Sequence, residues 1–174
     1  MYLVKTPFLV KKFLFPSYIW NGKKIAGQKT VYLTFDDGPT PKITEWVLQQ
    51  LKEYQARATF FCIGKNVVEH PDIYLKLKKS PHEVGNHTFN HFNGWETPTS
   101  DYLQNVAACK EVLESKWFRP PYGRIKRKQA KALQQEGYDI VMWSVLSGDF
   151  DETLSKEKCL ENVLGAVKDG DIVV

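Results

Sequence analysis

The sequence predicts an α/β fold in which parallel strands alternate with crossover helices, arranged either as an open sheet or as a closed barrel. Two observations predict it. Short apolar runs typical of strands alternate with segments of helical period along almost the whole chain, and polar groups gather where the predicted strands end. Such folds place their functional sites at the carboxyl ends of the strands. At 174 residues the chain is long enough for one domain but not for two ordinary ones.

The first half of the chain begins with a strand over residues 31–35, which ends in Asp-Asp-Gly-Pro. Pro41 then opens a helix, because proline is favoured at the first helical position. The apolar face of this helix is expected to carry Ile43, Val47, Leu48 and Leu51. The other elements expected in this half are a buried strand over 58–63, a helix over 66–79 and a short strand around Val84.

The second half continues the alternation, starting with a helix over 100–115 that Ser100 could cap. Residues 118–123 contain two consecutive prolines, so they are expected to form a strand end followed by a rigid loop. The remaining expected elements are a helix over 126–136 stopped by Gly137, a strand over 138–143, a helix over 155–168 and the start of a last strand over 172–174.

The composition excludes several classes of protein. Hydrophobic residues make up 43% of the chain and charged residues 25%, which is typical of a globular domain, and no apolar run has the length of a membrane span. The three cysteines are an odd number without a close pair, so neither a disulfide framework nor a cysteine-based metal knuckle is expected. An apolar patch near the amino terminus is interrupted by Lys11 and Lys12, which argues against a signal peptide and favours a cytoplasmic or membrane-peripheral location.

Charge separates an amino-terminal arm, residues 1–29, from the predicted domain, residues 30–174. The arm holds six lysines and no acid, whereas the other 145 residues carry 18 basic and 20 acidic side chains. Nucleic-acid binding is therefore disfavoured. We expect the aromatic residues of the arm to pack on the domain, with weak contact to an anionic membrane surface as the alternative. The sequence indicates no particular oligomeric state.

Two pairs of polar residues suggest metal chemistry. Asp36 and Asp37 follow the first predicted strand, so one could bind a metal while the other faces a substrate water; an ordinary Asp-Gly-Pro turn is the alternative. His87 and His91 are four residues apart, which would place both rings on one side of a helical turn and suits a tetrahedral metal such as Zn²⁺. A catalytic zinc site usually has three protein ligands, and either aspartate could be the third. A plain surface pair remains possible for the histidines.

Three segments of the chain carry a resemblance to a known family. The motifs are TFDDGP at 34–39, NHTFNH at 86–91 and RPPYG at 119–123. In this order they resemble the first three signature motifs of the polysaccharide deacetylases, the NodB-like domain of carbohydrate esterase family four. The resemblance implies a distorted (β/α) barrel and a metal-dependent hydrolase that removes acetyl groups from a glycan such as peptidoglycan, chitin-like polymers or acetylated xylan.

The resemblance also implies roles for individual residues. Asp36 would be the catalytic base, and Asp37 would join His87 and His91 on the metal, expected to be Zn²⁺. Arg119 would orient the base, since a guanidinium beside Asp36 favours its ionised form.

The proline-rich loop and the last part of the chain would complete the site. The family uses the backbone N–H of a tyrosine, here Tyr122, to stabilise the oxyanion, and Pro121 would stiffen that loop and contact substrate. A partial match to the fourth family motif offers Asp149 as a further catalytic acid and Phe150 as an apolar wall for the acetyl methyl.

The fifth family motif supplies a histidine as general acid after a final apolar strand, but this chain ends in Gly-Asp-Ile-Val-Val. We therefore expect a truncated last strand, with its edge poorly closed or covered by the arm or another chain. Neither His70 nor His82 is placed to substitute, so protonation of the leaving amine would be impaired, by about 10²–10⁴ in rate. The alternative functions are hydrolysis of a small non-sugar amide and an inactive carbohydrate-binding role.

Overall fold

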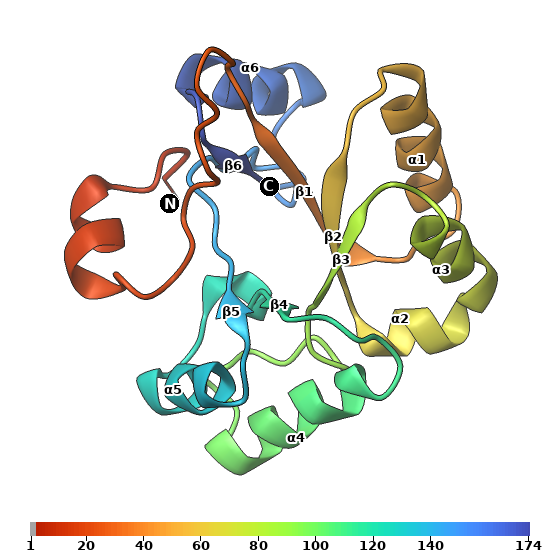
Figure 1. Ribbon diagram of the computed structural model, residues 1–174, viewed down its shortest axis with the longest axis vertical. Helices are drawn as coiled ribbons and strands as arrows, with labels where there is room; N and C mark the ends of the chain where they lie inside the picture. Colours follow the sequence, from red (N-terminus) through yellow and green to blue (C-terminus); the bar gives the residue numbers. More distant parts are fainter. Residues whose placement is uncertain (1–2) are drawn as a thin grey trace. The chain divides into compact units, whose positions relative to one another are not determined.

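The computed structural model describes residues 3–174, which divide into two compact units. One unit combines residues 3–34 with Val141–Val174, and the other is Phe35–Ile140. Six strands follow one another in the order β5-β4-β3-β2-β1-β6, and β1 contributes residues to both units (Figure 1). The pairings of β1 with β6, β2 with β3, β3 with β4 and β4 with β5 are parallel. The predicted α/β class is thereby confirmed.

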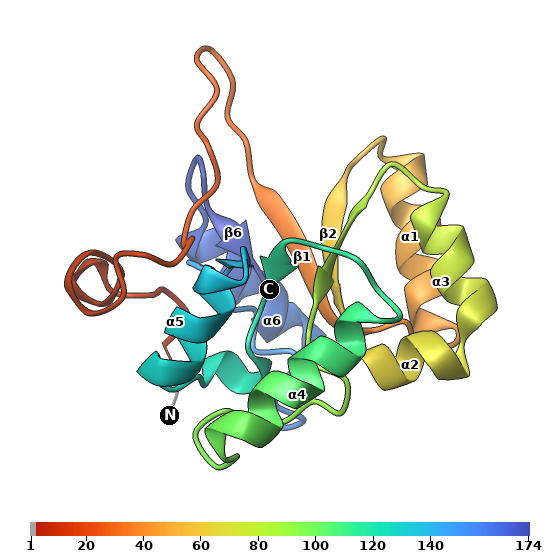
Figure 2. The same cartoon turned by 60° about the horizontal axis from the view of Figure 1, so that its bottom comes forward.

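Within Phe35–Ile140, strands and helices alternate as the sequence predicts. The elements are β1 (Tyr32–Gly38, entering from the other unit), α1 (Ile43–Glu53), β2 (Ala58–Cys62), α2 (Gly64–Glu69), α3 (Pro71–Lys78), β3 (Glu83–Asn86), α4 (Thr99–Lys110), β4 (Trp117–Phe118), the 3₁₀ turn η2 (Pro121–Gly123), α5 (Arg127–Gln135) and β5 (Asp139–Ile140). Helices α1 and α3 pack side by side, as do α4 and α5 (Figure 2).

The core of this unit forms where the central strands are buried on both faces. Phe60 and Phe61 of β2 and Phe118 of β4 are almost fully buried, and Phe60 stacks on Phe35 of β1 with ring centroids 5.2 Å apart. Gly85 of β3 lies so close to Phe61 that an added Cβ would fall 2.4 Å from the ring, so only glycine allows these strands to approach. Such packing fixes the register of the strands that end at the polar residues.

Three sequence predictions about helices in this unit are wrong in detail. The helix expected over 66–79 is two helices, α2 and α3, because Pro71 has no N–H and starts a new helix after the non-helical His70. Ile43 does not lie on the buried face of α1 but is 67% exposed, while Thr44 is buried in its place. Ser100 does not cap α4, which begins at Thr99 after Pro98.

The other unit contains the arm, the start of β1, and the last part of the chain. Its elements are the π-helical turn η1 (Val10–Leu14), α6 (Lys156–Ala166) and β6 (Ile172–Val173). Ser155 caps α6 by accepting a hydrogen bond from the Lys158 amide at 3.2 Å. None of the helices described in residues 3–174 has the length and apolar character needed to cross a bilayer.

The aromatic residues of the arm divide into buried and exposed ones. Tyr18 and Trp20 are buried, whereas Phe8 and Phe13 are more than 60% exposed, and packing of the arm on the domain stays a prediction. Phe13 belongs to η1, which buries none of its residues. Contact of this segment with an anionic membrane surface stays a prediction.

The outer edge of β6 is partly covered, which is one of the outcomes expected for the last strand. Val173 forms a parallel bridge to Val145, and Asp171, just before β6, forms an antiparallel bridge to Asn21 of the arm. The Val174 amide also donates to the Val145 carbonyl at 3.1 Å. Backbone groups at this edge therefore have partners from the arm and from residues 141–174.

Candidate metal centre and active site

Strand β1 carries Asp36 and Asp37 at its carboxyl end, and their side chains point in different directions. Asp37 has a φ of 67°, a left-handed conformation that turns the backbone between the two side chains. Asn66 of α2 supports this turn, since its Nδ2 donates to the Asp37 carbonyl at 2.8 Å. The two carboxylates therefore meet different neighbours: Asp37 meets the two histidines, and Asp36 meets Arg119.

His87 directly follows β3 and is held rigidly. Its side chain is only 2% exposed, and its backbone N–H donates to the Cys62 carbonyl of β2 at 3.0 Å. Its Nδ1 lies 2.7 Å from the Arg119 carbonyl, an acceptor, so Nδ1 carries the proton and Nε2 keeps its lone pair. This is the tautomer that binds a metal through Nε2.

His91 approaches the same point from a loop, not from the helical turn that the sequence suggested. Thr88 and His91 both have positive φ values, 64° and 57°, which no helix allows. Asn105 of α4 holds this loop, because its side-chain oxygen accepts from the Phe89 and Asn90 amides at 2.9 Å each. His91 Nδ1 lies 3.1 Å from the Tyr122 hydroxyl, which leaves Nε2 facing Asp37.

The three side chains converge on one point. Asp37 Oδ1 lies 3.4 Å from His87 Nε2 and 3.1 Å from His91 Nε2, and one ligand atom from each residue lies within 4.8 Å of the others. Tetrahedral ligands at zinc bond lengths are about 3.3 Å apart, so the donor set and its spacing fit such an ion. The cluster could therefore hold a metal, as the sequence predicts.

The charge state of Asp37 suits a ligand. Burial opposes its ionisation, but the His87 and His91 imidazoles that face it outweigh that effect and hold the pKa of the Asp37 carboxyl well below its usual range. Asp37 is thus a carboxylate whenever the histidines are in place.

Asp36 is paired with a buried arginine. Arg119 Nη1 donates to Asp36 Oδ1 at 2.8 Å, and the Arg119 side chain is fully buried, with its guanidinium 4.1 Å from the centre of the Phe61 ring. Burial lowers the pKa of Arg119, and the charge of Asp36 counters this. This hydrogen bond orients the Asp36 carboxylate.

The loop after β4 presents Tyr122 beside the cluster. Tyr122 has a φ of 59°, and the bonds inside the turn run from the Gly123 amide to the Pro120 carbonyl and from the Arg124 amide to the Pro121 carbonyl, both at 3.0 Å. These bonds leave the Tyr122 N–H out of the turn. Pro121 is buried and stiffens the loop.

Asp149 and Phe150 belong to the other unit, so their place in the site stays a prediction. Asp149 accepts a hydrogen bond from the Ser147 hydroxyl at 2.8 Å, and Phe150 is 63% exposed.

Two asparagines to which the sequence analysis assigned no role support the loop that carries His91. Asn105 has no sequence signal, since it sits in the middle of a helix. Asn86 belongs to the second motif but had no assigned role; it is buried, accepts from the Thr88 amide at 2.9 Å, and donates to the Val106 carbonyl of α4 at 3.0 Å. Both amides place the loop that carries His91.

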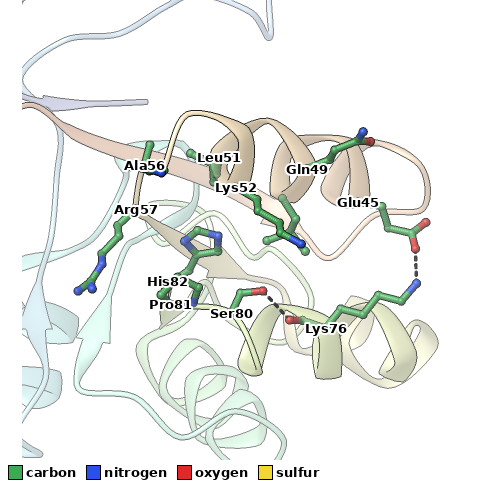
Figure 3. A pocket seen from close by; sticks show the side chains of 12 residues that line it. Glu45, Gln49, Leu51, Lys52, Ala56, Arg57, Lys76, Ser80, Pro81 and His82 are labelled. Atoms are coloured by element: carbon green, nitrogen blue, oxygen red, sulfur yellow. Dashed lines mark hydrogen bonds and ion pairs between the residues drawn. The ribbon is translucent and has the colours of Figure 1, made fainter.

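A pocket of about 740 Å³ lies elsewhere in this unit, between α1 and α3 (Figure 3). Its walls include Leu48 and Leu51 of α1, Lys76 of α3, and His82 before β3, and none of the cluster residues lines it. His82 precedes β3 and His87 follows it, so the pocket and the cluster lie at opposite ends of that strand. We therefore place the candidate site at the cluster, where three side chains of metal-ligand type converge.

Comparisons with known proteins agree with this arrangement. The sequence profile described as polysaccharide deacetylase matches residues 23–141. Two peptidoglycan-N-acetylglucosamine deacetylases of Bacillus cereus are 33% and 34% identical over 97% and 95% of this chain, which covers 62% and 81% of their lengths. A crystal structure of a peptidoglycan N-acetylglucosamine deacetylase bound to 4-naphthalen-1-yl-N-oxidanyl-benzamide matches with a TM-score of 0.85 at 32% identity, covering 97% of this chain and 79% of that one. On this evidence the chain belongs to the polysaccharide deacetylase family.

Proposed function

We propose that this protein is a metal-dependent deacetylase that removes N-acetyl groups from a glycan containing N-acetylglucosamine. The observation that carries the proposal is the convergence of Asp37, His87 and His91 next to the Asp36–Arg119 pair. Both named relatives from Bacillus cereus are deacetylases of N-acetylglucosamine in peptidoglycan, which supports the same substrate class here.

Each residue has a task that follows from its contacts. A bound divalent ion, which we propose is Zn²⁺, would polarise the amide carbonyl and the attacking water. Asp36, oriented by Arg119, takes the proton from that water. The Tyr122 N–H, left free by the turn, donates to the oxygen of the carbonyl as charge develops on it.

The first test is metal retention. Wild-type protein should retain one equivalent of Zn²⁺ after gel filtration, measured by plasma mass spectrometry, whereas His87→Ala and His91→Ala should retain none, since two ligands hold the ion too weakly. His70→Ala is the matched control, because His70 lies outside the cluster and should leave retention unchanged. Equal retention by all four proteins would show that the metal binds elsewhere.

The second test is acetate release from N-acetylglucosamine oligomers, peptidoglycan fragments and small non-sugar amides. Release from the glycans alone supports the proposal. Release only from the small amides would favour the amidohydrolase, and metal binding without any release would favour an inactive carbohydrate-binding member of the family.

A further inference from the structure

Two loops of the same unit run together beside the metal cluster. One is residues 91–97, which follow the second ligand histidine, and the other is residues 121–126, which include the Tyr122 turn. Four contacts tie them. His91 Nδ1 meets the Tyr122 hydroxyl at 3.1 Å, Trp95 Nε1 donates to the Ile125 carbonyl at 3.3 Å, Lys126 Nζ donates to the Thr97 carbonyl at 2.7 Å, and an ion pair of 3.9 Å joins the side chains of Glu96 and Arg124. We call them the paired loops.

A buried glutamine and a tightly packed glycine fix the conformation of the paired loops. Gln129 of α5 is fully buried, and its Nε2 donates to the carbonyls of Gly94 at 3.0 Å and Thr97 at 3.3 Å. A Cβ at Gly94 would fall 2.5 Å from the Arg124 carbonyl oxygen, so only glycine allows the two loops to approach this closely. The loop before α4 therefore has one defined conformation next to the cluster.

This rigid support holds a large aromatic ring in solvent. Trp95 is 60% exposed, although its indole N–H donates to the Ile125 carbonyl and its backbone N–H donates to Asn93 Oδ1 at 3.1 Å. The Arg124 guanidinium lies 5.3 Å from the centre of the ring. What remains available to a ligand is the apolar surface of the indole. Holding such a surface exposed gains nothing for folding, since burial of the ring would stabilise the protein.

Trp95 lies close in the chain to one of the proposed metal ligands. Trp95 is four residues from His91, so their Cα atoms are at most about 14 Å apart. A ligand that extends from the cluster beyond the unit that reacts can therefore reach Trp95. The chemical group that suits an apolar aromatic surface in a glycan is the face of a pyranose ring, where C–H groups point outward, and the Glu96–Arg124 pair beside it offers partners for hydroxyl groups.

We infer that Trp95 is a stacking platform for a sugar unit next to the one whose acetyl group is removed, so that the site binds oligosaccharides better than single sugars. This inference deepens the proposed function and rests on it. Trp95 contacts the substrate away from the reacting atoms, so it adds binding of extended substrate and leaves the chemistry at the cluster unchanged.

The kinetic test compares substrate lengths. For Trp95→Ala, kcat/KM on long N-acetylglucosamine oligomers should fall about tenfold, since removal of an aromatic anchor at an interface has effects of this size. Activity on the shortest substrate that wild type turns over, and zinc retention, should not change. Trp95→Phe should recover most of the loss. Tyr54→Ala removes another exposed aromatic, at the far end of α1, and should behave as wild type. An equal loss on all lengths would overturn the inference.

A binding test separates failure of the inference from failure of the proposed function. Zinc-loaded protein labelled with ¹⁵N is titrated with N-acetylglucosamine oligomers, and the indole N–H signals are followed by NMR, with Trp95 assigned through Trp95→Phe. The Trp95 signal should shift while that of Trp46, an equally exposed tryptophan on α1, should not. A shift without acetate release would keep the platform and reject the deacetylase. Acetate release without a shift of the Trp95 signal would support the deacetylase and reject Trp95 as a sugar-binding platform.

Discussion

At the scale of single residues, neighbouring aspartates acquire different tasks because the backbone turns between them. The left-handed conformation of Asp37 directs it to the histidines, while Asp36 stays with Arg119. The sequence showed that two carboxylates and two histidines follow strands, and the resemblance to the family assigned Asp37 and the two histidines as ligands and Asp36 as the base. It could not show the tautomers of the histidines, since these depend on the Arg119 carbonyl and the Tyr122 hydroxyl, more than 30 residues away in the chain.

Substitution of each aspartate by asparagine should separate catalysis from metal binding. Asp36→Asn cannot take a proton, so we expect zinc retention with a loss of acetate release of at least about 100-fold. Asp37→Asn removes a charged ligand, so it should weaken zinc binding itself, measured by competition with a chelator. Unchanged activity of Asp36→Asn would show that another residue is the base, with Asp149 the first candidate.

Asp36→Asn should also destabilise the folded protein, so loss of activity must be separated from unfolding. Arg119 is fully buried, and the amide removes the negative charge of Asp36 beside it, which we expect to lower the free energy of unfolding by about 3 kcal/mol. Activity should therefore be measured well below the melting temperature, with circular dichroism showing that the variant is folded.

At the scale of elements, the alternation of strands and helices was readable because buried strands and amphipathic helices leave clear periods in the sequence. The errors occur where local signals were ambiguous. The spacing of His87 and His91 suggested a helical turn. Instead, the side-chain oxygens of Asn86 and Asn105 accept hydrogen bonds from backbone amides and stabilise a loop with two left-handed residues. Tertiary partners of this kind have no local pattern. Pro71 did carry a signal, and the helix over 66–79 should have been divided there.

The loop that bears His91 should loosen when its support in α4 is removed. Asn105→Ala deprives the Asn90 amide of its acceptor, and we expect a loss of about 1–3 kcal/mol in the free energy of unfolding. Zinc affinity should fall about tenfold, because supporting residues orient ligands. Asn105→Asp keeps the acceptor oxygen and should lose less affinity, and Gln104→Ala, exposed on the same helix, should lose none. Normal zinc affinity in Asn105→Ala would show that the loop needs no such support.

At the scale of the whole chain, the arm and the last residues form one unit although they are far apart in sequence. Asp171 is their junction. Its carboxylate is 3% exposed, forms an ion pair with Lys5, accepts from Asn21 Nδ2 at 2.9 Å and Ser144 Oγ at 2.7 Å, and accepts from the Lys168 amide at 2.6 Å. The charge count predicted a separate basic arm, but it could not predict that one buried acid would bind it.

The protonation of Asp171 couples this junction to pH. Burial opposes ionisation, but hydrogen bonds from Lys5, Ser144 and the Lys168 amide outweigh it, so the pKa of Asp171 is lowered from its ordinary value of 3.8. Because the folded protein binds the proton less tightly than the unfolded chain, the stabilisation is fully present above the unfolded pKa. It is lost as the pH falls through the lower, folded pKa.

Asp171→Asn should therefore destabilise the protein near neutral pH and matter less in acid. We expect the variant to lose about 2 kcal/mol in the free energy of unfolding at about pH 7, because a buried charged acceptor with several donors is replaced by an amide that satisfies only some of them. The gap to wild type should shrink below about pH 4, because Asp171 of the unfolded wild-type chain then begins to take up a proton that the folded protein binds less tightly. Urea unfolding of both proteins, followed by circular dichroism from about pH 7 to about pH 3, measures the stability difference and its change with pH. Asp139→Asn is the control, since Asp139 is half-exposed with Lys116 3.9 Å away, and it should change stability by no more than about 0.5 kcal/mol at any pH. A gap for Asp171→Asn that stays constant down to about pH 3 would mean that the carboxylate acts through its shape and hydrogen bonds, and that its charge contributes nothing to holding the arm.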